Sequence, residues 1–302
     1  MRLGDSCSKA GEPHETCVRT VCFLSMDDLT GYVFDDELAF APLAKLGIAV
    51  ETLSWRQRTH KWSEFDAVVI RTTWDYQRFP EEFLSVLAEI EAATELYNPL
   101  GVVRWNFDKI YLRELAENGV NIVPTLFETQ YSAENFAVWL DRLKVPELII
   151  KPRVSATAEH TFRLREFDPT LSESFEQRPF LVQPFLDAIV NEGEYSLFYF
   201  GGEYSHAILK EAKTDDFRVQ EEHGGIITSI EAADAMKDAA TQALAAIAEP
   251  LLYARVDLVR NVRGGFQLME LELIEPALYF RMSERSATLF AEKLDLQLRR
   301  SR

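Results

Sequence analysis

Cysteine is scarce in this sequence, and its three cysteines, Cys7, Cys17 and Cys22, all lie near the N-terminus. Their spacing matches no metal-binding motif, and an odd number of clustered cysteines does not build a disulfide framework. We therefore expect reduced thiols and a cytoplasmic location.

Long apolar runs are absent as well. Charged residues interrupt every candidate for the roughly 20 apolar residues that a membrane helix requires, so no membrane partner is expected. Residues 1–18 lack the apolar core of a signal peptide, and we interpret them as a poorly ordered extension.

Basic residues are outnumbered. The chain has 32 Lys and Arg against 49 Asp and Glu, which gives a net charge of −17. A nucleic-acid partner would require a basic footprint and is therefore not expected. A nucleotide needs only a local cationic pocket and is compatible with this composition.

Strand and helix patterns alternate in residues 19–105, which predicts a small open α/β domain. The expected strands span 19–25, 48–55 and 65–76, and the expected helices span 35–47 and 81–93. The segment NPLGVVRWN, residues 98–106, begins with an Asn-Pro turn signal and is predicted to be the exit loop.

Hairpins and helices are mixed after residue 105, which predicts an α+β architecture with a central part at 106–185 and a C-terminal part at 186–302. Asp108 and Ser132 are candidate helix N-caps. The expected elements are strands 146–152 and 178–186, hairpins 194–210 and 253–275, and helices 108–119, 132–143, 233–251 and 283–299.

The last hairpin places carboxylates inside an apolar strand, LMELELIEP. Side chains two positions apart in a strand share a face, so Glu270 and Glu272 are expected on one side together with Phe266 and Leu268. Met269 is expected on the opposite side. Two neighbouring carboxylates in such a strand repel each other and lose hydration.

A third carboxylate is predicted beside them. If residues 262–265 form the hairpin loop, Asp257 lies opposite Glu270. Two unit charges about 4 Å apart repel by about 4 kcal/mol at a surface-like dielectric. A raised pKa, an arginine such as Arg255, or a divalent cation relieves this repulsion. Arg255 is the simpler alternative, and Mg²⁺ is the more specific one, because it uses one or two carboxylates plus phosphate oxygens.

Candidates for binding a nucleotide occur in the same half of the chain. The cations that suit phosphates are Lys109, Lys151, Lys210 and Arg218. The strand end QPFL, residues 183–186, suits a flat aromatic ring, and Glu192 and Glu194 suit ribose hydroxyls. Each feature alone is ordinary, and their order along the chain is what indicates a nucleotide site.

This order resembles that of the ATP-grasp superfamily. The resemblance runs from about Asn98 to the end of the chain, in WNFDKIYL, IIKP, VQPFL, NEGEYSL, YFGGEYSHAILK, DDFRVQEEHGG, ARVDLV and MELELIEP. The sequence is most similar to the glutathione-synthetase-like branch, and there to the cyclase that closes O-ureido-serine in cycloserine biosynthesis. The resemblance implies an ATP-grasp fold, in which an N-terminal open α/β domain precedes two α+β subdomains that sandwich ATP.

The resemblance also implies residue roles. The implied ATP-binding residues are Lys109, Lys151, Ser155, Gln183, Pro184, Phe185, Leu186, Glu192 and Glu194. The implied Mg²⁺ ligands are Asp257, Glu270 and Glu272. The implied catalytic residues, which face the γ-phosphate and the phosphorylated intermediate, are Lys210 and Arg218.

Two features depart from the superfamily pattern. Many relatives have Glu-x-Asn where this chain has Glu270 and Glu272, and the extra charge is expected to strengthen cation binding. Relatives often have glycines after the lysine that matches Lys151, whereas this chain reads RVSATAEHT and is stiffer there. The hydroxyl groups that remain for phosphate binding belong to Ser155, Thr157 and Thr161.

The substrate is expected at the rim of the N-terminal domain, because ligands of open α/β sheets bind beyond the carboxyl ends of the strands. The candidate residues are Asp28, Arg71, Trp74, Asp75 and Tyr76. Arg71 is the candidate for a substrate carboxylate. The alternative is that Trp74 and Tyr76 pack at a domain interface.

The predicted function is that of an ATP- and Mg²⁺-dependent ligase or cyclase. Such an enzyme activates a small carboxylate as an acyl phosphate, which an amine-type acceptor then attacks. Two alternatives remain open: a nucleotide-binding scaffold without turnover, and a kinase acting on a small-molecule hydroxyl. A homodimer is a further expectation, because relatives are often dimers.

Overall fold

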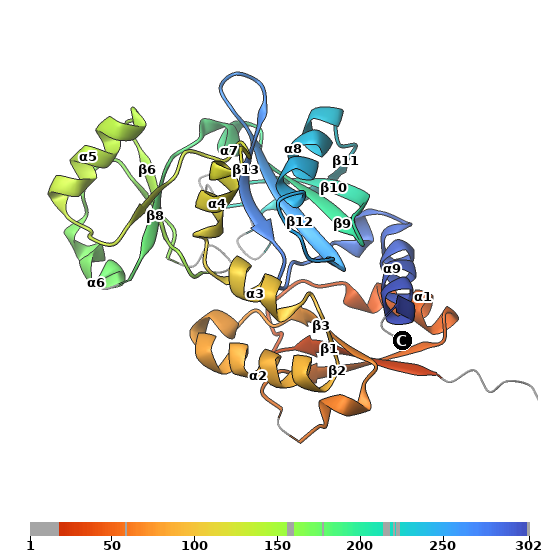
Figure 1. Cartoon of the computed structure of the whole chain (residues 1–302). Coiled ribbons are helices and arrows are strands. Elements are labelled where there is room, and N and C mark those ends of the chain that lie inside the picture. Colours follow the sequence, from red (N-terminus) through yellow and green to blue (C-terminus); the bar gives the residue numbers. More distant parts are fainter. Residues whose placement is uncertain are drawn as a thin grey trace, which may run out of the picture.

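Three sheets organise the chain. The computed structural model describes residues 18–57, 59–155, 160–176, 178–213, 218–219, 221 and 224–300. Figure 1 shows the N-terminal sheet at the bottom, the central lobe on the left, and the C-terminal sheet above the former and to the right of the latter. No helix in this part of the chain has the length and apolar character needed to cross a membrane.

The N-terminal sheet is entirely parallel, with strand order β2-β1-β3-β4. Its elements are β1 (Arg19–Ser25), η1 (Asp36–Ala39), α1 (Phe40–Lys45), β2 (Ile48–Ser54), η2 (Trp62–Glu64), β3 (Ala67–Thr72), η3 (Tyr76–Arg78), α2 (Pro80–Ala93) and β4 (Glu95–Tyr97). Alternate residues point to opposite faces, so Val21 and Phe23 pack with α1 whereas Cys22 and Leu24 pack with α2. Burial on both faces explains why β1 and β3 are almost continuously apolar.

The central sheet is antiparallel, with strand order β5-β8-β6-β7. Its elements are β5 (Leu126–Glu128), α5 (Ala133–Leu143), β6 (Leu148–Pro152), β7 (Phe162–Leu164), η4 (Pro169–Leu171), α6 (Ser172–Phe175) and β8 (Phe180–Pro184). Ser132 caps α5 by accepting a hydrogen bond from the Asn135 N–H at 3.2 Å, as predicted. Trp139 of α5 and Phe175 of α6 pack on Phe180, which closes one face of this small sheet.

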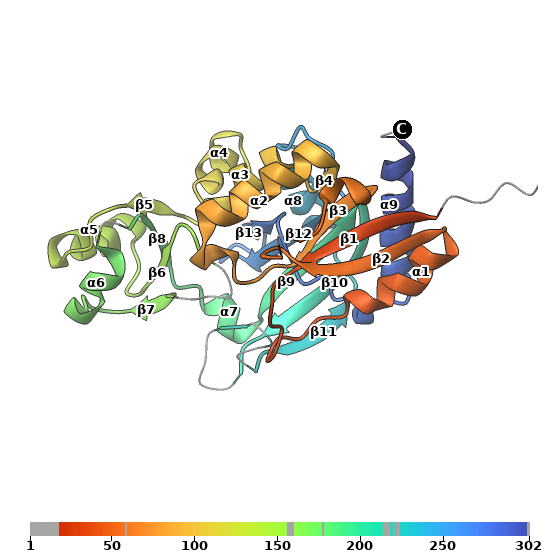
Figure 2. The ribbon, with the colours of Figure 1, turned by 90° about the horizontal axis from the view of Figure 1, so that it is seen from below.

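The C-terminal sheet is antiparallel, with strand order β11-β10-β9-β12-β13. Its elements are α7 (Asp187–Asn191), β9 (Glu194–Phe200), β10 (Glu203–Glu211), β11 (Ile226–Ile230), α8 (Asp234–Leu244), β12 (Tyr253–Arg260), β13 (Phe266–Glu272), η6 (Phe280–Met282) and α9 (Ser286–Arg300). Leu197 and Val256 lie in the core beneath α8. On the opposite face, Phe198 and Phe200 pack with α9. Since α9 also packs on α1, the last helix joins the last sheet to the first (Figure 2).

The start of β9 requires a glycine. Gly193 has a φ of 110°, and a Cβ at this position would lie 2.6 Å from the Lys210 carbonyl oxygen. A side chain is therefore excluded where β9 pairs with β10. The turn between these strands is the predicted Gly201-Gly202 pair, with φ values of 53° and 80°.

The predicted exit loop is wrong. Residues 98–106 run instead into α3 (Leu100–Phe107), because Leu100, Val102 and Val103 are buried on one side of a helix that starts after Pro99. The predicted strand 65–76 is also too long, since β3 ends at Thr72.

The next helix, α4, starts later than predicted and packs in a different part of the chain than predicted. α4 (Tyr111–Glu117) has Ile110 at its N-cap, and Asp108 Oδ1 accepts a hydrogen bond from the Ile110 N–H at 2.9 Å. Although α4 falls in the predicted central part of the chain, Tyr111 and Leu115 are buried in the core of the C-terminal sheet.

His206 provides a test of this core. It is buried and stacks on Phe198 with ring centroids 4.3 Å apart, and burial lowers its pKa to about 4. Because the folded pKa lies below the unfolded value of about 6.5, the neutral imidazole stabilises the fold fully above pH 6.5 and progressively less as the pH falls towards 4. Between pH 6.5 and pH 4 the wild type is therefore expected to lose up to about 3 kcal/mol of its free energy of unfolding through His206. We expect His206→Gln not to show this loss in urea titrations across the same pH range.

The matched control is His60→Gln, at a partly exposed histidine, measured over the same pH range. A His206→Gln slope identical to that of the wild type would contradict the assignment.

Candidate active site

A cavity of about 210 Å³ lies where the three sheets approach one another. The central sheet contributes Ile149, Lys151 and Gln183 to its lining. The C-terminal sheet contributes Glu194, Lys210, Arg255, Met269, Glu270 and Glu272, and the loop after β3 contributes Trp74 and Tyr76. Residues that are more than 190 positions apart in the sequence therefore meet in one pocket.

The carboxylates reach this cavity because β13 contains a bulge. Leu258 pairs with Leu268, but the next residue, Asp257, pairs with Glu270, so Met269 is the extra residue. The predicted pairing of Asp257 with Glu270 is confirmed. Glu270 and Glu272 both face the cavity, as predicted. The predicted faces of Leu268 and Met269 are wrong, because the bulge turns Leu268 into the apolar core and Met269 towards the cavity.

Side chains from α3 and α4 satisfy the outer edge of β13, which is the last strand of its sheet. Asn106 Nδ2 donates to the Leu271 carbonyl oxygen at 2.7 Å, and Asn106 Oδ1 accepts from the Leu273 N–H at 3.0 Å. The Tyr111 hydroxyl accepts from the Leu271 N–H at 2.9 Å. These bonds fix the backbone that carries Glu270 and Glu272.

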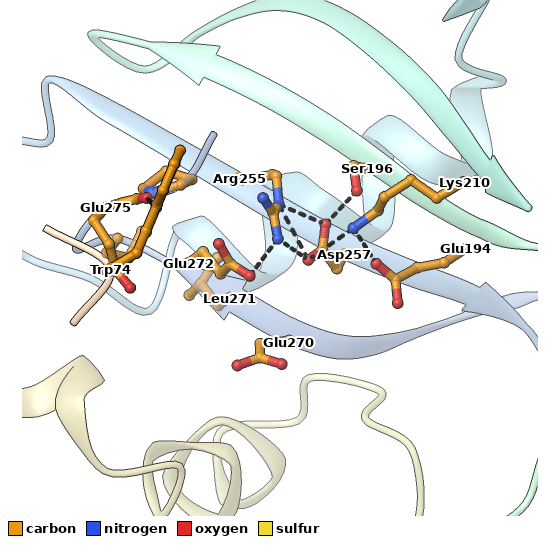
Figure 3. A network of polar contacts seen from close by, with 12 residues as sticks. Trp74, Glu194, Ser196, Lys210, Arg255, Asp257, Glu270, Leu271, Glu272 and Glu275 are labelled. Carbon is orange, nitrogen blue, oxygen red and sulfur yellow. Dashed lines mark hydrogen bonds and ion pairs between the residues drawn. The ribbon is translucent and has the colours of Figure 1, made fainter. Parts of the chain in front are cut away.

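Cross-strand pairs place the charged groups on one face of the sheet. Lys210 pairs with Glu194 across β10 and β9, and its Nζ lies 3.6 Å from Asp257 Oδ2. Arg255 Nη2 lies 2.9 Å from Asp257 Oδ2 and also pairs with Glu272 (Figure 3). The predicted cluster therefore exists, and Arg255 neutralises part of it, as the simpler alternative expected.

Glu270 is held from another side of the cavity. Lys109 Nζ lies 3.0 Å from Glu270 Oε1 and donates to the Ser155 carbonyl oxygen at 2.6 Å. Asp257 is 2% exposed and does not line the cavity, so Glu270 and Glu272 are the two predicted metal ligands that face it.

Burial and crowding shift the pKa values in the cavity. Burial, reinforced by the negative charges of Asp257 and Glu270, raises the pKa of Glu272 to about 7 even though Arg255 opposes the shift. Burial and the charge of Glu272 raise the pKa of Glu275 to about 8. Both shifts show that ionised carboxylates are disfavoured at this end of the cavity, first by burial and then by their mutual repulsion.

Lys151 is a buried cation of the same cavity, and its pKa is lowered. It is 9% exposed, and burial together with the charge of Lys109 lowers its pKa, although Glu270 opposes this. No ion pair joins Lys151 to a carboxylate among the described residues. An ammonium in this situation favours the binding of an anion.

The predicted adenine-binding segment also lines the cavity. Gln183, Pro184, Phe185 and Leu186 all contribute to the wall. The Phe185 N–H donates to the Glu147 carbonyl oxygen at 3.0 Å, and its ring lies under the Arg163 guanidinium at 3.6 Å. Ser155, Thr161 and Arg218 line the cavity too, whereas Thr157 lies outside the described residues.

Besides Asp257, four predicted ligand-binding residues lie outside the cavity. Glu192 pairs with Arg260 at 2.7 Å and accepts a hydrogen bond from the Tyr195 hydroxyl at 2.5 Å. Asp75 accepts from Trp55 Nε1 at 2.7 Å. Asp28 is exposed and accepts from the Thr30 N–H. We therefore assign no ligand role to these three residues.

Arg71 is the fourth, and its predicted role in binding a substrate carboxylate does not fit the structure. Its side chain is 1% exposed, and its Nη2 lies 2.8 Å from Asp36 Oδ1 and 3.1 Å from the Pro276 carbonyl oxygen. The guanidinium is thus occupied in fixing the segment that follows β13.

Sequence reasoning did not assign site roles to Arg255, Glu275 and Asn106. Arg255 was available only as a neutralising alternative, and Glu275 stood in the motif MELELIEP without a role. Asn106 gave no signal, because its task depends on α3 lying beside the edge of β13.

The residues present fit a magnesium-bound nucleotide. Among the described residues, no three His, Cys, Asp or Glu side chains are already gathered for a metal ion. However, Mg²⁺ needs only one or two carboxylates when phosphate oxygens complete its coordination, and Glu270 and Glu272 face the cavity beside Lys109. A cation at this position would relieve the mutual repulsion of these two carboxylates.

The chain has a parallel N-terminal sheet followed by two antiparallel sheets, and a cavity lined by lysines and carboxylates lies among them. This is the architecture of an ATP-grasp ligase, an enzyme that joins a carboxylate to an amine. Residues 21–98 match the family model described as D-cycloserine synthetase DcsG, N-terminal domain. The cycloserine biosynthesis protein DcsG of Streptomyces lavendulae is 32% identical over 276 residues, which cover 84% of this chain and 90% of the relative. The chain belongs to the DcsG family.

Solved structures agree with this assignment. The crystal structure of D-cycloserine synthetase DcsG has a TM-score of 0.80 and 29% identity, covering 92% of this chain and 99% of the other. The ATP-grasp ligase PsnB, complexed with minimal precursor, Mg and ADP, has a TM-score of 0.63 and 16% identity, covering 93% of this chain and 98% of the other. The latter similarity shows the shared fold.

The buried pair of Arg71 and Asp36 makes a testable prediction. Arg71→Met leaves the Asp36 carboxylate, which is 7% exposed, without its partner, so we expect the free energy of unfolding to fall by about 3–5 kcal/mol. The double variant Arg71→Met/Asp36→Asn removes the orphaned charge and is expected to recover part of this loss in urea titrations. Full stability of Arg71→Met combined with loss of substrate binding would restore the role predicted from the sequence.

Proposed function

We propose that this ligase uses ATP and Mg²⁺ to phosphorylate a small, amino-acid-like carboxylate and then joins the acyl phosphate to an amine-type nucleophile, as a cyclase or between two molecules. The observation that carries the proposal is Lys151, a buried ammonium that lines the cavity without an ion-pair partner among the described residues. An anion such as a nucleotide phosphate supplies the missing charge.

The nucleotide base has an apolar place beside these charges. Ile149, Leu186 and Met269 line the part of the cavity near the predicted adenine segment. The ADP and Mg in the PsnB structure, whose fold this chain shares, support both cofactors.

The chain's own residues have complementary tasks. Lys109 and Lys151 would bind phosphate oxygens, and Glu270 and Glu272 would hold Mg²⁺. Mg²⁺, when bound, neutralises charge on the phosphates during transfer. A carboxylate is a poor acyl donor, so phosphorylation gives it a leaving group that an amine can displace.

The remaining cavity residues protect and direct this chemistry. Lys210 and Arg218 would face the transferred phosphoryl group. Trp74, Tyr76 and Phe107 form an apolar wall that limits the access of water, which hydrolyses acyl phosphates.

One assay separates the proposed function from its two alternatives. The purified chain is incubated with ATP, Mg²⁺ and a panel of amino acids and analogues that includes O-ureido-serine, and ADP release is measured. Release that depends on a carboxylate supports the ligase. A phosphorylated hydroxyl in the product identifies a kinase, and tight ATP binding without release identifies a scaffold.

Glu270 tests the metal assignment. Glu270→Gln keeps the shape of the side chain but removes the charge, so we expect turnover to fall by about 100-fold or more. Calorimetry is expected to show that Mg²⁺ no longer improves the binding of an ATP analogue. Glu117→Gln, at an exposed position on α4, is the control for the same charge change. Unchanged Mg²⁺ dependence in Glu270→Gln would contradict the assignment.

Lys151 tests the nucleotide site. Lys151→Met keeps the apolar stem but removes the buried ammonium, and we expect affinity for an ATP analogue to fall about tenfold or more in calorimetry. Lys45→Met, on the exposed side of α1, is expected to bind like the wild type. Equal affinity of both variants for the ATP analogue would contradict the role of Lys151 on which the proposed function depends.

A further inference from the structure

The end of the cavity nearest the N-terminal sheet combines aromatic rings with an acid. Trp74 and Tyr76 line it with 7% and 6% of their surfaces exposed, and Glu275 lies beside them. Trp74 Nε1 donates to the Glu275 backbone oxygen at 2.9 Å, and the Tyr76 hydroxyl is a hydrogen-bonding neighbour of the Glu275 carboxyl group. Figure 3 shows Trp74 and Glu275 together at one end of the polar network, with Lys210 and Glu194 at the other.

These groups are held in place before any ligand binds. Tyr76 stacks on Phe83 with ring centroids 4.8 Å apart and contacts Phe107 at 5.1 Å. Arg71 holds the Pro276 carbonyl oxygen, directly after Glu275, at 3.1 Å. The geometry is therefore preorganised, which lowers the entropic cost of binding.

Glu275 differs from the other carboxylates of the cavity in its partners. Glu194 pairs with Lys210, Glu270 with Lys109, and Glu272 with Arg255. No ion pair joins Glu275 to a cation among the residues that the structure describes. The half-buried carboxyl group of Glu275 thus lines the cavity near Glu272 and has no ion-pair partner among the described residues.

We propose that Glu275, Trp74 and Tyr76 bind the ammonium group of the substrate, so that the enzyme selects amino acids over the corresponding carboxylic acids that lack the amino group. This inference rests on the proposed function, which supplies the substrate carboxylate. It adds which further group the substrate carries and which residues recognise it.

Two independent features of the subsite favour an ammonium. Glu275 has no ion pair with a cation among the described residues, and Trp74 and Tyr76 line the cavity beside it, where aromatic rings add attraction for a cation. An ammonium donates hydrogen bonds to the Glu275 carboxyl group and stabilises its ionised form, whereas a phosphate or carboxylate offers neither. A divalent metal prefers several oxygen ligands, whereas two of the three walls here are aromatic.

The inference is tested with matched pairs of substrates in the ADP-release assay. Each amino acid is compared with its analogue lacking the amino group, such as serine with 3-hydroxypropionate and alanine with propionate. Binding of the same probes is measured by calorimetry in the presence of an ATP analogue and Mg²⁺. We expect the wild type to prefer the amino acid by about tenfold or more in kcat/KM or in affinity.

The variant Glu275→Gln is expected to reduce this preference to near unity while leaving the affinity for the ATP analogue unchanged. Glu275→Asp retains the charge and is expected to restore part of the preference. Glu117→Gln, at the exposed position on α4, is the control and is expected to keep the wild-type ratio. A merely structural role of Glu275 would alter stability or overall rate, but not the ratio between matched substrates.

The outcomes distinguish this inference from the proposed function. Equal use of both members of a pair, an unchanged ratio in Glu275→Gln, or binding of no amino acid in the panel would overturn the inference. Binding of amino acids that Glu275→Gln abolishes, without ADP release from any carboxylate, would support the subsite and overturn the proposed function.

Discussion

The repulsion between carboxylates on one face of the C-terminal sheet is the constraint on which the site depends. Glu194, Asp257, Glu270 and Glu272 lie on three neighbouring strands, and Lys210, Arg255 and Lys109 hold them together. Two of these cations come from the sheet itself, whereas Lys109 comes from the segment between α3 and α4. The cations of the sheet therefore leave Glu270 without an ion pair among the described residues, and Lys109 from the preceding segment provides it.

Buried polar side chains also link the C-terminal sheet to the N-terminal sheet. Asn98 Nδ2 donates to the Leu273 carbonyl oxygen at 2.7 Å and to the Tyr253 carbonyl oxygen at 2.9 Å. The Tyr253 hydroxyl bonds to the carbonyl oxygens of Ile70 and Ile274. A buried donor left without its acceptor costs about 1–3 kcal/mol. These bonds therefore favour one arrangement of the N-terminal sheet against the end of β13, and this arrangement brings Trp74 to the cavity.

Local patterns predicted much of the fold, but they did not predict what depends on distant packing. The apolar run in residues 19–25 and the Gly201-Gly202 turn are local signals, and β1 and the β9–β10 hairpin were predicted correctly. The short strands β4, β5 and β7 have three residues each and exist because a neighbouring strand pairs with them. The bulge at Met269 was missed because strict alternation assumes an unbroken register. Arg71 was misassigned because its partner Asp36 lies 35 residues earlier.

The distribution of charge in the cavity also limits how a substrate can lie. In the proposed site, Lys151 beside the central sheet binds an anion, whereas Glu275 beside the N-terminal sheet binds a cation. Glu270 and Glu272 lie between them on β13, so a carboxylate that is to be phosphorylated can approach them only together with a neutralising cation. A substrate with opposite charges at its two ends fits when its anionic end lies towards Lys151 and its cationic end towards Glu275, and it does not fit in the reverse direction. Under this proposal, electrostatics orients the substrate even before its shape is considered.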